Sequence, residues 1–171
     1  DTNKGDELNP EYRSRIVRKD LKTKRGPNMP AIDTFAPMLA LEMLKLMLSL
    51  ASAWHKSRRG GSLTRMVVDV KRAHWNADAR RVIYIQLPDE DYEEGMCGLA
   101  LKALYGFLDA ASCWNEEVGS MLADNGFAVG KANPALFHHE AEDIIGLVHG
   151  DDFVTLADDQ GQDFFEACLT K

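Results

Sequence analysis

The chain has 171 residues, of which 45% are hydrophobic and 27% charged, a composition that suits one folded domain. Its formal net charge of -7 excludes a uniformly cationic surface for nucleic acid. The three cysteines lack paired Cys-x-x-Cys spacing, which argues against a disulfide framework and a zinc finger and favours a reducing compartment. No signal peptide is recognisable, so we expect an intracellular protein, cytoplasmic or nuclear.

Charge is distributed unevenly along the chain. Residues 55–82 carry a net charge of +6, whereas residues 83–171 carry -15. Basic side chains neutralise phosphates and clustered carboxylates attract Mg²⁺, so the junction of the two regions suits a polyanion together with a divalent cation. The asymmetry alone fits a solvated surface without a partner equally well.

The first half of the chain is predicted to hold one long helix. Residues 1–30 are polar and are expected to form an arm or an incomplete subdomain. Polar residues recur along one side of residues 37–54, which predicts a mostly buried core helix rather than a membrane span. Residues 55–62, with two arginines followed by two glycines, are predicted to form a basic flexible loop.

The second half alternates between strand and helix patterns. Runs of β-branched and aromatic residues predict strands at 66–70 and 81–87, with room for a short helix between them. The acidic run 89–94 is predicted to be an exposed loop, and a helical period follows over 98–125 with a break near Gly106. Strands at 136–139, 144–148 and 153–157 and a helix at 162–169 complete the order.

This order predicts an α+β fold with helices packed on one face of an antiparallel sheet. Ferredoxin-like and polymerase-palm arrangements both fit it.

Acidic residues at two strand ends form the main candidate site. Gly150-Asp151-Asp152 separates two apolar runs, and a tight turn there would present two carboxylates at an edge of the sheet, although an ordinary hairpin turn explains this motif alone. Asp69 lies inside or at the end of an otherwise apolar strand, where an unpaired carboxylate is unfavourable without a cation or a donor. If the two segments are neighbours, their oxygens suit Mg²⁺ or Mn²⁺, and two such ions support in-line phosphoryl transfer to a primer 3′-hydroxyl.

Five short motifs follow one another along the chain, namely Tyr12-Arg13-Ser14-Arg15-Ile16-Val17, Asp33-Thr34-Phe35-Ala36-Pro37, Val68-Asp69-Val70-Lys71, Leu104-Tyr105-Gly106 and Gly150-Asp151-Asp152-Phe153. Together they resemble the reverse transcriptase of copia-type LTR retrotransposons. The Gly150 variant of the turn is similar to copies from dinoflagellate genomes. The resemblance extends from Tyr12 to about Ala157.

The resemblance implies RNA-directed DNA polymerisation, a nucleotidyl transfer that uses two Mg²⁺ or Mn²⁺ ions. It implies an RNA or DNA template-primer and deoxynucleoside triphosphates as partners, and no membrane. The implied catalytic and metal-binding residues are Asp69, Asp151 and Asp152. The implied substrate-binding residues are Arg13, Arg15, His74 and Gly106. Residues 1–62 would be a partial fingers region containing the buried helix, and 63–171 a palm.

The chain departs from the family pattern in ways that predict impaired activity. His74 stands where the family has an aromatic ring that excludes a ribose 2′-hydroxyl, and Asp109 places a negative charge where template phosphate is expected. Compared with the family, we expect the thumb and ribonuclease H to be absent. We therefore expect a truncated copy whose metal site persists while processive synthesis does not. A non-enzymatic nucleic-acid-binding module and a pseudoenzyme remnant, both on the same kind of sheet, are the alternatives.

Overall fold

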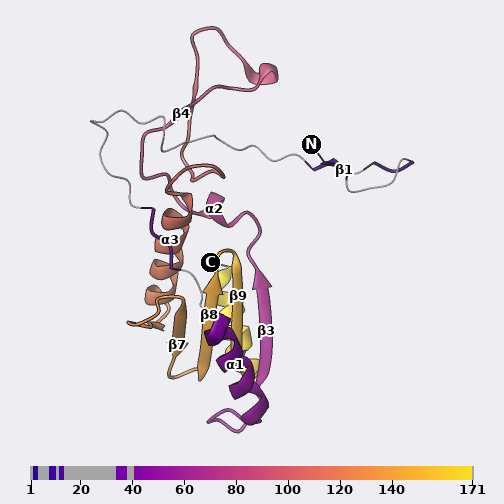
Figure 1. Cartoon of the computed structure of the whole chain (residues 1–171), viewed down its shortest axis with the longest axis vertical. Helices are drawn as coiled ribbons and strands as arrows, with labels where there is room; N and C mark the ends of the chain where they lie inside the picture. The colour runs from indigo at the N-terminus through magenta and orange to yellow at the C-terminus, as the bar shows by residue number, and fades with distance from the viewer. Residues whose placement is uncertain (1, 4–7, 11, 14–33, 38–40, 171) are drawn as a thin grey trace.

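A computed structural model describes residues 2–3, 8–10, 12–13, 34–37 and 41–170 (Figure 1). Its largest sheet has five antiparallel strands in the order β3-β9-β8-β7-β6, with β3, β9, β8 and β7 side by side in Figure 1. The strands are β3 (Thr64–Asp69), β6 (Ala128–Val129), β7 (Leu136–His139), β8 (Ile144–His149) and β9 (Asp152–Ala157). The predicted antiparallel sheet is confirmed.

Two helices, α3 (Ala110–Asp124) and α4 (Asp159–Leu169), cover one face of this sheet. Alternate residues of a strand point to the same face, and Phe137 and Phe153 are buried on this one. Leu147 and Leu156 are buried on the opposite face. Phe165 of α4 is fully buried, with its ring 5.6 Å from that of Phe137 and 5.7 Å from that of Phe153. These contacts place the main hydrophobic core between the helices and the sheet.

Helix α1 (Leu41–Ala53) confirms the helix predicted over 37–54 within the residues that the structure describes, but the prediction of a mostly buried helix is wrong. Met47 is 3% exposed, whereas Leu41 is 58% and Leu46 52% exposed. An apolar surface favours burial without guaranteeing that a partner surface exists. Trp54, directly after α1, borders a cavity together with Ile145 on the sheet face opposite α3 and α4. The prediction that all helices lie on one face of the sheet is therefore wrong for α1, which leads to the opposite face.

No helix among the described residues is both long enough and apolar enough to cross a bilayer.

The predicted flexible loop at 55–62 is instead held by ion pairs. Arg59 donates to Asp158 at 2.7 Å and to the Glu142 carboxylate at 2.6 Å. Arg58 donates to Asp143 at 2.8 Å. The glycines next to the arginines indicated flexibility, but carboxylates distant in sequence supply the restraint.

The predicted strand at 81–87 is short and does not join the large sheet. It contains β4 (Tyr84–Ile85), which pairs with β5 (Gly98–Leu99) in a separate ribbon. Because residues 98–103 bond to residues 77–85, the predicted helix over 98–125 begins only at Ala110, where α3 starts. A short helix α2 (Ala73–Asn76) follows β3 as expected. The acidic segment contains the exposed 3-10 turn Asp89–Asp91.

Near the start of the chain, β1 (Thr2–Asn3) pairs with β2 (Tyr12–Arg13).

Candidate functional site

The register of the sheet brings the three predicted acidic residues to one edge. Asp69, the last residue of β3, is the direct partner of Asp152, the first residue of β9. The backbone N–H of Val70 donates to the carbonyl oxygen of Asp151 at 2.9 Å. Segments more than eighty residues apart in sequence therefore meet at the point that the sequence indicated. We call Asp69, Asp151 and Asp152 the acidic edge.

Asp151 belongs to a two-residue turn. His149 pairs with Asp152, which leaves Gly150 and Asp151 as the connection between β8 and β9. Gly150 has φ +65°, a backbone conformation that glycine adopts without steric penalty. A glycine of positive φ at the first turn position is typical of a type II′ hairpin, whose twist matches that of the strands. The predicted tight turn is confirmed.

The acidic edge is exposed to solvent and carries uncompensated charge. Asp69, Asp151 and Asp152 are all exposed. Residues directly opposite in an antiparallel pair share a face of the sheet, so Asp69 and Asp152 project to the same side, and like charges in that arrangement repel. The ion pairs between described residues leave these three carboxylates unpaired.

The carboxylates do not form a closed metal centre. Within the described ranges, no three His, Cys, Asp or Glu side chains are grouped closely enough to hold a metal ion. The backbone thus brings the predicted ligands together, while their side chains do not converge on one point. The donor set fits Mg²⁺ or Mn²⁺ chemically, because exposed carboxylate oxygens are the ligands these ions prefer.

His74, in α2, lies near the acidic edge. Burial lowers the pKa of its imidazole, and the negative charge of Asp151 acts in the opposite direction. The ring packs edge-on against Tyr105 with centroids 4.7 Å apart, and its Nδ1 is buried without a hydrogen-bond partner in the part of the chain that the structure describes. The imidazole is therefore a partly buried, flat side chain beside the turn rather than a solvated surface residue.

A cavity of about 200 Å³ adjoins the turn. Its lining includes His74, Trp114, His149 and Gly150, and Trp114 donates from its indole Nε1–H to the Gly150 carbonyl oxygen at 2.7 Å. Trp114 is also part of the hydrophobic core, and the sequence gives no sign of this hydrogen bond. An aromatic residue on a helix gives no local signal of the distant backbone oxygen that it meets.

For the other predicted substrate-binding residues, the structure shows no strand pairing or hydrogen bond with the acidic edge among the described residues. Gly106 lies in a turn with φ +90° three residues before the N-cap of α3. Arg13 lies in β2, which pairs with β1 in a sheet separate from that of the acidic edge, as far as the described residues show. Arg15 falls outside the residues that the structure describes.

Asp109, predicted to place a negative charge where template phosphate is expected, is buried in the structure. Its side chain accepts two hydrogen bonds from Arg81, at 2.8 and 2.7 Å. Burial by itself raises the pKa of this carboxyl, but the hydrogen bonds and charge of Arg81 outweigh burial, and the pKa lies below its ordinary value. The carboxylate therefore anchors the start of α3. The adjacent arginines at 80 and 81 indicate a carboxylate partner, but the sequence does not show which carboxylate it is.

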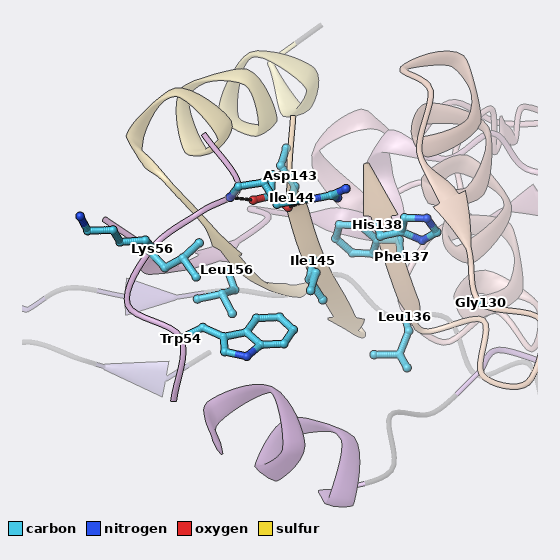
Figure 2. A pocket seen from close by; sticks show the side chains of 12 residues that line it. Trp54, Lys56, Gly130, Leu136, Phe137, His138, Asp143, Ile144, Ile145 and Leu156 are labelled. Atoms are coloured by element: carbon cyan, nitrogen blue, oxygen red, sulfur yellow. Dashed lines mark hydrogen bonds and ion pairs between the residues drawn. The ribbon is translucent and has the colours of Figure 1, made fainter. Parts of the chain in front are cut away.

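The larger cavity, of about 670 Å³, lies away from the acidic edge (Figure 2). Trp54 lies beside Ile145 and Leu156 in this view, at the end of the β8–β9 pair opposite the Gly150 turn. Its lining is mainly apolar, and its Arg58 is paired with Asp143. This cavity offers volume without the carboxylate chemistry that the acidic edge supplies.

Comparison with known protein families gives one match over nearly the whole chain. A family model described as reverse transcriptase (RNA-dependent DNA polymerase) matches residues 1–166. No solved structure matches the chain.

Proposed function

The chain belongs to the reverse transcriptase (RNA-dependent DNA polymerase) family, and on that premise we propose that its acidic edge is the site of template-directed nucleotidyl transfer. The observation that carries the proposal is the register of β3 with β9, which sets Asp69 opposite Asp152 and bonds Val70 to Asp151. The five sequence motifs support a copia-type LTR retrotransposon, similar to dinoflagellate copies, as the source of the domain.

In this proposal Asp69, Asp151 and Asp152 hold two divalent cations, Mg²⁺ or Mn²⁺. When bound, such ions activate the primer 3′-hydroxyl and neutralise charge on the transferred phosphate. The chain itself supplies an exposed, unpaired set of carboxylates on a turn fixed by the strand register. The repulsion between Asp69 and Asp152 favours a cation between them.

The remaining substrate contacts follow from the family. His74 lies near Asp151 and, in this proposal, its flat ring borders the sugar of the incoming nucleotide. Gly106 and the arginines at 13 and 15 contact substrate, with residues 1–62 serving as fingers and 63–171 as palm. An RNA or DNA template-primer and deoxynucleoside triphosphates are the partners.

A base-stacking module on the same sheet is less favoured. Such modules use aromatic side chains on an exposed sheet face. The aromatic residues of the five strands, Phe137 and Phe153, are buried on the helix side, and exposed positions of the opposite face include Val67 and Asp69. Aspartates at this edge also repel a phosphate backbone that arrives without cations.

Metal binding tests the proposed site. Isothermal titration with Mn²⁺ should show binding to the wild-type chain that weakens by at least about 100-fold in Asp69→Asn and in Asp151→Asn. Loss of a residue that only supports a metal ligand lowers metal affinity by about 10- to 100-fold, and loss of a ligand itself should cost no less. Asp163→Asn changes an exposed aspartate on α4 and is the matched control. Equal Mn²⁺ affinity in all four proteins would overturn the assignment.

Primer extension on an RNA template tests the chemistry. We expect at most short, non-processive nucleotide addition with Mg²⁺ or Mn²⁺, which disappears in Asp151→Asn and persists in Asp163→Asn. Extension that survives Asp151→Asn would contradict the proposed role of the acidic edge. Metal binding without extension would identify a decayed copy that keeps its cation site.

A further inference from the structure

The turn that carries Asp151 is tied to helix α3 by the side chain of Trp114. The indole Nε1–H donates to the Gly150 carbonyl oxygen at 2.7 Å. Gly150 is exposed, and beyond Gly150 and its two chain neighbours no heavy atom lies within 4 Å of the position where a Cβ would stand. Side-chain packing at this residue therefore does not fix the turn, which makes a directed hydrogen bond to its carbonyl more important.

This carbonyl belongs to the central peptide of the turn, between Gly150 and Asp151. Types I′ and II′ differ by a flip of that peptide, and type I′ requires positive φ at both central residues. Here Gly150 has positive φ and Asp151 does not. A flip would move Asp151 into the left-handed region, which aspartate adopts more readily than most residues but less readily than glycine, and would redirect its side chain. The Trp114 hydrogen bond holds the carbonyl in the orientation that avoids the flip.

The donor is itself well anchored. Trp114 is 8% exposed and is part of the main hydrophobic core together with Val118 and Leu122 of the same helix. The N-cap of this helix is Asp109, whose buried carboxylate is held by Arg81 at two points. The hydrophobic core therefore holds the indole N–H in place against the carbonyl oxygen of an exposed turn.

We propose that Trp114 is a positioning residue for Asp151, which sets the backbone geometry of the turn and thereby the direction of the Asp151 carboxylate. The proposal rests on the proposed function, because a fixed carboxylate direction matters only if Asp151 holds a cation. In this role Trp114 acts on Asp151 through the Gly150 peptide.

The test removes the donor and keeps the ring. In Trp114→Phe we expect Mn²⁺ affinity to fall about three- to tenfold, the change that corresponds to one ordinary net hydrogen bond. Trp54→Phe is the matched control, because it makes the same chemical change beside the other cavity, at the opposite end of the β8–β9 pair. Should Trp114→Phe fail to fold, benzothienylalanine at position 114 keeps the indole shape and replaces only the N–H.

A second readout follows the turn without metal. The three-bond amide-to-Hα coupling of Asp151, measured by NMR on the metal-free chain, reports φ at this residue. The coupling should change in Trp114→Phe and stay constant in Trp54→Phe. A role in packing alone would lower the melting temperature without moving this coupling.

The outcomes separate the two claims. Unchanged Mn²⁺ affinity in a folded Trp114→Phe, with tight binding in the wild type, would overturn the positioning role and leave the proposed function intact. Absence of Mn²⁺ binding in the wild-type chain would overturn the proposed function. In that case the Asp151 coupling alone decides whether Trp114 sets the geometry of the turn.

Discussion

Strand β9 has a carboxylate at each end, and the two carboxylates differ in their hydrogen-bond and ion-pair partners. Asp152 begins the strand, is exposed, and lies opposite another aspartate. Asp158 follows the strand, is buried, and accepts hydrogen bonds from Ser57 at 2.6 Å and Arg59 at 2.7 Å. The buried carboxylate of Asp158 meets donors within the chain, whereas those of the acidic edge have no ion-pair partner among the described residues.

The largest effect on stability is expected at the paired end. Asp158→Ala removes a buried partner of Arg59 and also the side chain that caps α4 at the backbone N–H of Gly161. We expect the free energy of unfolding to fall by about 2–4 kcal/mol, because breaking a largely buried pair and losing a cap are both costly. Urea unfolding measures this change.

The control for this variant is Asp159→Ala. Asp159 is the exposed first residue of α4, where a negative charge contributes less than about 1 kcal/mol through the helix dipole. Equal destabilisation by the two variants would contradict the special role of the paired carboxylate. Mn²⁺ affinity should stay unchanged in both.

The second expected effect is a pH dependence of stability. The hydrogen bonds from Arg59 and then Ser57 lower the pKa of Asp158 to about 2, from an ordinary value of 3.8. The folded state therefore binds its proton less readily than the unfolded state, so this stabilisation is complete above pH 3.8 and is lost as the pH falls towards 2. Unfolding curves across this window should decline less steeply in Asp158→Ala than in the wild type.

The smallest effect is expected at the acidic edge, with the opposite sign. Asp69→Asn removes one of two like charges that face each other across the strands. In metal-free buffer we expect the chain to become more stable by about 0.2–1 kcal/mol, since opposed like charges destabilise a sheet by about this amount. Thermal unfolding with a chelator present measures the change, and destabilisation instead would indicate a hidden partner for Asp69.

Addition of Mg²⁺ should make the wild type more stable than Asp69→Asn, the reverse of their order in metal-free buffer. Mg²⁺ raises the melting temperature of a chain that binds it only when folded. We therefore expect an increase for the wild type and none for Asp69→Asn.

Local patterns predicted the elements that form the acidic edge. β-branched runs identified β3, β8 and β9, and Gly150 identified the turn, because each signal lies within a few residues. The meeting of Asp69 with Asp152 was expected only on the condition that β3 and β9 are neighbours, which the structure supplies.

Long-range partners could not be predicted. Ser57 and Asp158 lie 101 residues apart, and Arg81 and Asp109 lie 28 apart. The sequence shows which residues are charged, but pairing depends on how the elements pack. The same reason explains β4, whose partner β5 fell inside a predicted helix, and the exposed side of α1, which lacked the expected cover.

Paramagnetic broadening by Mn²⁺ tests the shared cation site most directly. In an ¹⁵N-labelled chain, small amounts of Mn²⁺ should broaden the amide signals of Val70, Asp151 and Asp152 first. Those of Arg59 and Gly161, at the paired end, should stay sharp. Asp69→Asn should abolish the selective broadening. Equal broadening at both ends, or a pattern that Asp69→Asn leaves unchanged, would contradict a cation held at the acidic edge.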